Sequence, residues 1–130
     1  MTLLLDTHAF LWWLGGSRKL GRRARRAIET GDAVWLSAAS AWEIAIKAAL
    51  GRLDITEGAE IALPRELARS GFQPLAISVA HALAAGALPP HHADPFDRML
   101  IAQADAEGLT LVTADDIFDR YGVSTLDAGA

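Results

Sequence analysis

Short apolar runs alternate with longer amphipathic patterns along the chain. The runs at 2–6 (TLLLD), 33–37 (AVWLS) and 109–113 (LTLVT) are each brief and end in a polar residue, which is typical of buried strands. Residues 123–126 (VSTL) have the same character, whereas 75–77 (LAI) is too short to assign. Strands separated by helices predict a parallel sheet covered on both faces, so we expect an α/β fold.

Six helical patterns lie between these runs. Their approximate ranges are 8–14, 22–30, 39–50, 58–70, 78–87 and 95–107. The last begins at Asp94-Pro95, an N-cap residue followed by proline at the first helical position, and ends at Gly108. We therefore interpret Asp94 as a cap and not as a ligand.

Apolar spacing predicts which side of the third helix is buried. Trp42, Ile46 and Ala49 recur at i, i+4 and i+7, so we expect this side to face the core. The other three tryptophans also lie in apolar patterns, and we expect core positions for them. Trp12 and Trp13 are adjacent, which leaves one of the two free to be exposed.

Length and composition limit the class of protein. The chain has 130 residues, of which 52% are hydrophobic and 22% charged, which fits one folded domain over 1–130 and argues against disorder. The absence of cysteine excludes disulfides, thiolate metal sites and a cysteine nucleophile. No apolar run approaches the ~18–20 residues of a membrane helix, and the apolar N-terminus lacks a basic region. We therefore expect a cytoplasmic protein that does not contact a membrane.

Charge is distributed unevenly along the chain. The formal net charge is −4, yet residues 18–26 carry six basic residues and no acid, which leaves −10 on the remainder. We call this segment the basic strip. It is suited to contact a phosphate backbone or an acidic partner segment, and a solvated helix face is the alternative. Its basic residues are Arg18, Lys19, Arg22, Arg23, Arg25 and Arg26.

Four carboxylates occupy positions at strand ends or helix starts. Asp6 ends the first strand, Glu43 lies early in the helix after the second, Asp97 lies in the first turn of the last helix, and Asp115 follows the LTLVT strand. These positions share one edge of a parallel sheet, where ligands bind in such folds. The sequence therefore predicts that the four side chains converge on one pocket.

Such convergence favours a bound cation. Two like charges ~4 Å apart repel by about 4 kcal/mol at an effective dielectric near 20. Mg²⁺ or Mn²⁺ removes this penalty, because hard cations prefer oxygen ligands. A divalent ion held by carboxylates suggests hydrolysis of phosphodiester bonds.

Two of these acids also have local structural interpretations. Asp6 can be the cap of the following helix. Ser40-Ala-Trp-Glu43 matches a capping box, and Glu43 can pair with Lys47 at i+4. On local pattern alone the structural role is favoured for Glu43.

The acids later in the chain occupy two kinds of position, one facing the core and the others at the start of a short helix. Asp97 shares a helical stripe with Ile101 and Ala104, so its side chain should point along the core-facing side, where an acid needs a partner. Asp115 and Asp116 can both be first-turn acids of a short following helix, favoured by its dipole.

Three histidines lie near these positions. His8 can be a ligand or a general base, although a packed or capping role is more common beside a strand end. His91 and His92 follow Pro89-Pro90, and we expect both in a solvent-exposed loop, with nickel- or zinc-type binding as the alternative.

Four sequence blocks cover nearly the whole chain. They are DTHAFLWWL (6–14), LSAASAWEIAIK (36–47), LPPHHADPFDRMLIAQA (88–104) and LVTADDIFDRYGV (111–123). In their order and spacing these blocks together resemble the PIN-domain proteins, and in particular the VapC-type toxins of bacterial toxin–antitoxin pairs.

The resemblance implies a three-layer α/β/α domain with a mostly parallel sheet, usually dimeric, that acts as an endoribonuclease dependent on Mg²⁺ or Mn²⁺. It also implies a small cognate antitoxin that inserts a segment into the acidic groove. The family's acidic positions fall on Asp6, Glu43, Asp97 and Asp115. The first, third and fourth would hold the metal, and Glu43 would bind a metal or help to deprotonate the attacking water.

The resemblance assigns secondary roles to two further residues. Thr113 matches a hydroxyl position that orients Asp6 or a water molecule from behind the ligands. Asp116 is an additional acid that can assist or replace Asp115.

Other classes fit less well. Phosphatases of the haloacid-dehalogenase type need Asp-x-Asp at the first strand, where this chain has His8, and receiver domains need a late lysine, whereas Lys19 and Lys47 come early. A binding module for RNA or protein that keeps the fold without turnover stays open. Its affinity for RNA would survive Asp6→Asn and would not depend on a divalent ion.

Overall fold

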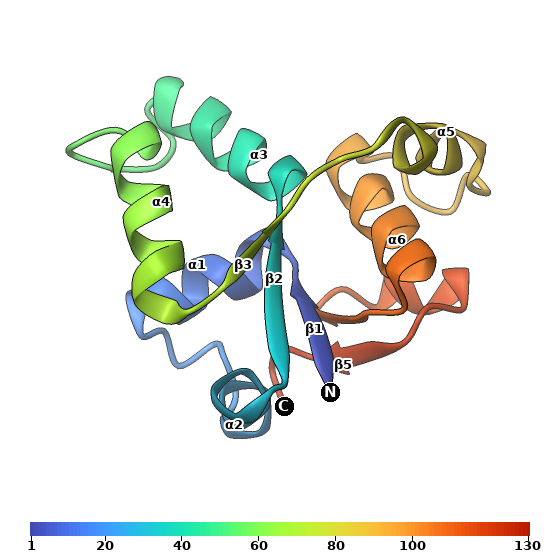
Figure 1. Ribbon diagram of the computed structural model, residues 1–130, viewed down its shortest axis with the longest axis horizontal. Helices are drawn as coiled ribbons and strands as arrows, with labels where there is room; N and C mark the ends of the chain where they lie inside the picture. The colour runs from blue at the N-terminus through green and yellow to red at the C-terminus, as the bar shows by residue number, and fades with distance from the viewer.

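The computed structural model describes residues 1–130 and contains one five-stranded sheet in which every neighbouring pair is parallel (Figure 1). The strand order is β3-β2-β1-β4-β5, so the first strand is at the centre. This confirms the α/β prediction. The strands are β1 (Thr2–Leu5), β2 (Ala33–Ser37), β3 (Gln73–Leu75), β4 (Thr110–Thr113) and β5 (Thr125–Asp127).

Six α-helices and one short 3₁₀ helix surround this sheet. In Figure 1, α1, α2 and α4 lie to one side of it and α5 and α6 to the other, which gives three layers. None of the helices is long and apolar enough to span a membrane. The helices are α1 (Thr7–Gly15), α2 (Arg22–Thr30), α3 (Ala38–Ala49), α4 (Ala59–Ser70), α5 (Val79–Ala87), α6 (Pro95–Glu107) and η1 (Asp116–Tyr121).

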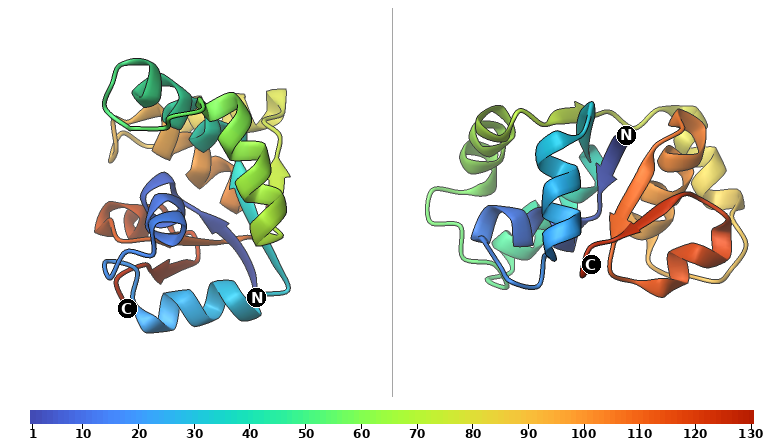
Figure 2. Two further views of the ribbon diagram at one scale, coloured as in Figure 1. Left: turned by 90° about the vertical axis from the view of Figure 1, so that its left-hand side faces the viewer. Right: turned by 90° about the horizontal axis from the view of Figure 1, so that it is seen from below.

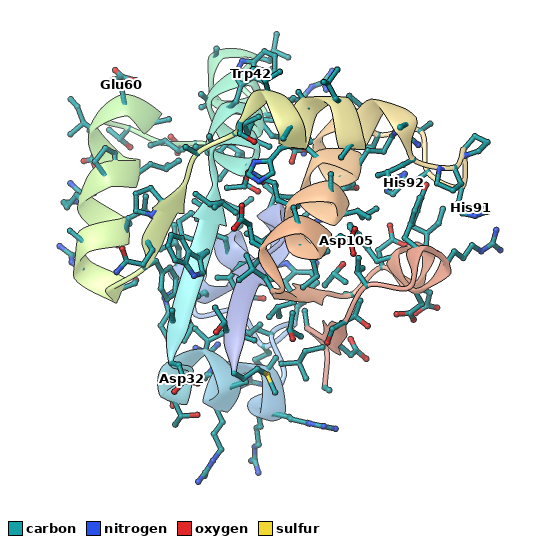
Figure 3. The ribbon with its side chains drawn as sticks, turned by 45° about the vertical axis from the view of Figure 1, so that its right-hand side comes forward. Asp32, Trp42, Glu60, His91, His92 and Asp105 are labelled. Carbon is teal, nitrogen blue, oxygen red and sulfur yellow. The ribbon has the colours of Figure 1, made fainter.

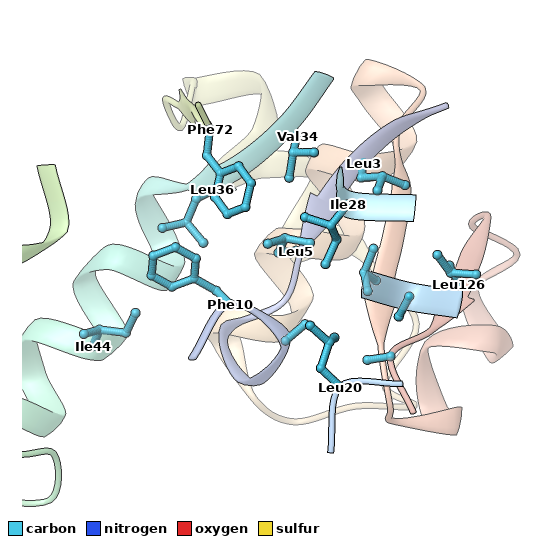
Figure 4. Packing of buried hydrophobic residues seen from close by; sticks show 14 of the residues in the cluster. Leu3, Leu5, Phe10, Leu20, Ile28, Val34, Leu36, Ile44, Phe72 and Leu126 are labelled. Carbon is cyan, nitrogen blue, oxygen red and sulfur yellow. The ribbon is translucent and has the colours of Figure 1, made fainter. Parts of the chain in front are cut away.

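The central strand explains the two hydrophobic clusters. Side chains alternate across a strand, so Leu3 and Leu5 enter the cluster on the α1/α2/α4 side, and Leu4 enters the cluster against α6. All three are fully buried, which accounts for the uninterrupted apolar run of β1. Figure 4 shows the larger cluster, in which Leu5 lies close to Leu36 of β2 and to Phe10 of α1.

The element boundaries largely follow the sequence pattern. Each predicted helix agrees with the structure within one residue at either end, and β5 starts two residues later than predicted. The segment 75–77 is not a strand by itself, since β3 covers Gln73–Leu75 at the edge of the sheet. Pro74 is tolerated there because an edge strand leaves one side free of ladder hydrogen bonds.

The predicted buried side of α3 is wrong. Trp42 is 64% exposed, and the buried residues of this helix include Ser40 and Ile44. Helix α3 has two apolar stripes, and the one that carries Ile44 packs into the larger hydrophobic cluster. The stripe that carries Trp42 does not. Trp42 therefore makes an edge-on contact with Phe96 of α6, with ring centroids 5.4 Å apart, and leaves most of its surface to solvent.

Candidate active site

Asp6 lies where the central strand becomes the first helix. Its carboxylate caps α1 by accepting a hydrogen bond from the Ala9 amide at 2.8 Å, so the cap interpretation is confirmed. The residue is only 6% exposed. Burial raises its pKa above the ordinary value; hydrogen bonds from Ala9 and the Thr113 hydroxyl oppose this, as does His8, and the charge of Asp115 adds to it. Asp6 is therefore a buried acid whose negative charge is only partly compensated.

Asp97 is in the first turn of α6, which Asp94 caps as predicted by accepting from the amides of Phe96 and Asp97. The stripe shared with Ile101 is confirmed, because that residue is 1% exposed. Burial raises the pKa of Asp97 to about 6, and the charges of Asp94 and Asp6 also raise it, while His92 opposes them. The cap at Asp94 thus adds negative charge beside Asp97.

His92 contradicts the expectation of a solvent-exposed loop. Its side chain is 17% exposed, and Nε2 lies 2.8 Å from Asp97 Oδ2 and 3.8 Å from Asp115 Oδ2. Figure 3 shows the loop of His91 and His92 between α5 and α6, beside η1. His91 is exposed, as predicted, with its ring edge against Tyr121. The position of His92 five residues before Asp97 was the available signal, but only the path of the loop brings the two together.

Asp115 follows β4 and caps η1, accepting from the amide of Ile117 at 3.1 Å. Its own amide donates to Thr113 Oγ1 at 3.1 Å. Because the Thr113 hydroxyl also hydrogen-bonds Asp6, one threonine connects the two acids. Asp116 is exposed and lines a hollow of about 400 Å³ together with Asp6, Asp115 and three neighbours, His8, Trp12 and Ala114.

Glu43 is joined to the site through α1. The predicted capping box is wrong, because Ser37 caps α3 and Glu43 lies beyond the first turn. The predicted pair with Lys47 is present at 3.2 Å. Glu43 Oε1 also accepts a hydrogen bond from the Thr7 hydroxyl at 2.7 Å, and Thr7 follows Asp6 directly. The carboxylate is therefore held from two sides.

The donor set suits a hard divalent cation. Side-chain nitrogen or oxygen atoms of His92, Asp97 and Asp115 all lie within 4.8 Å of one another, and the charge of Asp6 raises the pKa of Asp97. Buried carboxylates with raised pKa values are stabilised in their charged form by a cation. Oxygen donors in this number favour a hard divalent cation over metals that prefer sulfur.

The basic strip lies on a different part of the molecule. It covers the turn after α1 and most of α2, which ends beside Met1 at the amino end of β1 (Figure 2). Arg25 is placed over the ring of Trp13, 5.7 Å from its centroid. A hollow of about 580 Å³ is lined by Arg18, Arg22 and Arg25. None of these arginines pairs with the site carboxylates, so the strip forms a separate cationic surface.

Comparison with known proteins identifies similar chains. Residues 3–124 match the sequence profile of the PIN domain. The chain is 33% identical over 120 residues to Ribonuclease VapC22 of Mycobacterium tuberculosis, covering 88% of this chain and 87% of that protein.

Two solved structures have the same fold. VapBC2 from Rickettsia felis, bound to a DNA fragment from its promoter, has a TM-score of 0.72 at 16% identity, over 97% of this chain and 98% of the other. A toxin–antitoxin complex from Klebsiella pneumoniae has a TM-score of 0.60 at 22% identity, over 87% and 86%.

Proposed function

The chain belongs to the PIN-domain family, and we propose that it is a metal-dependent endoribonuclease that hydrolyses phosphodiester bonds of RNA. The observation that carries this proposal is the cluster of Asp6, Asp97 and Asp115 at the carboxyl edge of the sheet, with two of the three pKa values raised. The curated relative is named a ribonuclease, which supports RNA as the substrate.

In this proposal the acidic residues and Thr113 have different roles at the metal site. Asp6, Asp97 and Asp115 would hold a Mg²⁺ or Mn²⁺ ion. When bound, such an ion polarises the phosphodiester and makes a nearby water molecule more acidic. Thr113 would orient the Asp6 carboxylate through its hydroxyl, and the same hydroxyl accepts from the backbone amide of Asp115. Asp116 is exposed at the rim of the same hollow, where it can assist Asp115.

Glu43 takes the role of a general base or an additional ligand. Its contacts with Thr7 and Lys47 fix the orientation of its carboxylate, and general bases of this kind contribute typically 10²–10⁴-fold to rate. Attack of water in line with the leaving oxygen would give a 5′-phosphate and a 3′-hydroxyl.

We further propose an antitoxin as partner, together with a homodimer. One structure with this fold is described as a toxin–antitoxin complex. Large apolar side chains at Trp42, Val79 and Leu83 are 64–77% exposed, which is typical of surfaces that a partner covers. The basic strip would contact RNA phosphates or an acidic partner segment.

Cleavage of a structured RNA by the purified chain tests the proposal. We expect cutting with Mg²⁺ or Mn²⁺, none with EDTA, and loss of cutting in Asp97→Asn. Asp105→Asn is the matched control, because Asp105 is an exposed acid on the same helix (Figure 3). RNA binding that is indifferent to metal and unchanged in Asp6→Asn would instead identify a binding module without turnover.

A further inference from the structure

We infer that His92 is a positioning residue which donates a hydrogen bond from Nε2–H to Asp97, and that the surrounding loop is built to hold its ring in that orientation. The inference rests on the proposed function for its relevance to catalysis. It assigns His92 a place behind a ligand, not among the ligands, although Nε2 is close enough to both Asp97 and Asp115 to be mistaken for one.

The first support of the loop is Arg98, the residue after Asp97. Its guanidinium donates to five backbone carbonyls at 2.8–3.5 Å, those of Ala85, Gly86, Leu88, Pro89 and His92. Three of these carbonyls belong to the end of α5 and its cap, where a helix leaves acceptors without partners and where a cation is favourable. The four N–H groups on the two terminal nitrogens of a planar guanidinium can serve these carbonyls together when one N–H is shared, and a lysine cannot.

The second support is Tyr121 at the end of η1. Its hydroxyl donates to the Pro89 carbonyl at 2.9 Å and accepts from the His92 amide at 2.7 Å. The His92 ring also packs edge-on against Phe118, which is 1% exposed. The loop is therefore fixed by α6, which carries Asp97, and by η1, which Asp115 caps.

The hydrogen-bond pattern assigns the tautomer of His92. The amide of Asp94 donates to Nδ1 at 3.3 Å, so Nδ1 is an acceptor and carries no proton. A neutral imidazole then has its proton on Nε2, the atom 2.8 Å from Asp97 Oδ2. Binding a metal through Nε2 would move this proton to Nδ1 and set two N–H groups against each other at Asp94.

The consequence for Asp97 is orientation. Its Oδ2 accepts from His92, which leaves Oδ1 free to face a cation. A partner of this kind behind a ligand typically affects metal affinity or activity by 10–100-fold when removed. His92 thus fixes the orientation of the Asp97 carboxylate in the metal-free protein, before a cation or RNA binds.

Nitrogen-15 NMR of the histidine-labelled full chain tests the tautomer directly. We expect the His92 proton on Nε2 both without and with Mg²⁺. The His92→Gln spectrum identifies the signal. A proton on Nδ1 in either condition would overturn the inference. This readout involves no RNA, so it stands apart from the cleavage result.

The Mn²⁺ affinity of the full chain, measured by calorimetry without RNA, is the second test of the positioning role. We expect His92→Ala to weaken binding about 10-fold. His92→Gln should remain close to the wild type, because its amide can still donate to Asp97. His91→Ala is the neighbouring control and should have no effect. Equal losses in the Ala and Gln variants, or no loss in His92→Ala, would refute a positioning role. A wild type that binds Mn²⁺ without cutting RNA would overturn the proposed function and leave this inference standing.

Discussion

The Thr7 hydroxyl donates to Glu43 Oε1 at 2.7 Å and lies 3.0 Å from Ser40 Oγ, so the first residue of α1 fixes a carboxylate of α3. Thr7 is buried, and it directly follows Asp6 in the chain. Two consecutive residues therefore provide the acid at the end of β1, Asp6, and the hydrogen-bond donor to a second acid, Glu43. The start of α1 is thereby tied to the second turn of α3.

Thr7→Val should lower kcat about 10-fold with little change in KM, because Glu43 loses its donor while the substrate surface stays intact. Thr7→Ser keeps the hydroxyl and should behave like the wild type. Steady-state cleavage of one RNA substrate measures both constants. A rise in KM with kcat unchanged would instead mean that Thr7 serves substrate binding.

Asp6→Asn should abolish cleavage and yet stabilise the metal-free protein by about 1 kcal/mol, or several degrees in Tm. Asparagine caps a helix as well as aspartate does, and it removes a buried charge whose pKa burial has raised. Thermal unfolding in EDTA measures the change. Asp116→Asn, at an exposed position beside the site, should leave Tm nearly unchanged. A clear drop in Tm for Asp6→Asn would show that its charge is fully compensated in the fold.

The pH dependence of stability should report Asp97. Its pKa rises from 3.8 to about 6 on folding, so the folded state holds the proton more tightly than the unfolded chain. Its contribution to stability is fully present below about pH 3.8 and is lost as the pH rises to about 6; Asp6 acts in the same direction. Denaturant unfolding in EDTA should therefore show a decline over this window that is smaller in Asp97→Asn. An equal decline in both proteins would contradict the assignment.

Reversing the charge at Arg22 and Arg23 tests the basic strip. The double variant Arg22→Glu/Arg23→Glu should bind RNA more weakly and with a flatter dependence on salt, because fewer counterions are released. Arg52→Glu/Arg69→Glu makes the same change in net charge at two positions outside the basic strip. Unchanged affinity at low salt in the first variant would show that the strip is a solvated face.

Trp42→Ala should weaken self-association while changing the free energy of unfolding by less than about 1.5 kcal/mol, since the main loss is one aromatic contact with Phe96. Sedimentation and thermal unfolding measure the two effects. Leu50→Ala removes another exposed apolar side chain of the same region and serves as the comparison. An unaffected dimer in Trp42→Ala would place the interface elsewhere.

The sequence was most informative where one signal dominated. Strands and helices followed the alternation of apolar runs, and Asp94-Pro95 located the start of α6 to the residue. Trp42 was misplaced because two stripes of similar hydrophobicity compete on α3, and only the neighbouring elements decide between them. His92 was missed because a loop has no period, and its path depends on Arg98 and Tyr121, which no local pattern connects to it.

The pairing of β1 with β4 has a consequence during synthesis of the chain. The central strand is made first, but its partner on one side, residues 110–113, emerges only after most of the chain. Contacts of such long sequence separation form late and slowly. A partly synthesised chain holds Asp6 and Glu43 but neither Asp97 nor Asp115. Any activity of the acidic cluster is therefore withheld from the growing chain until its last quarter has left the ribosome.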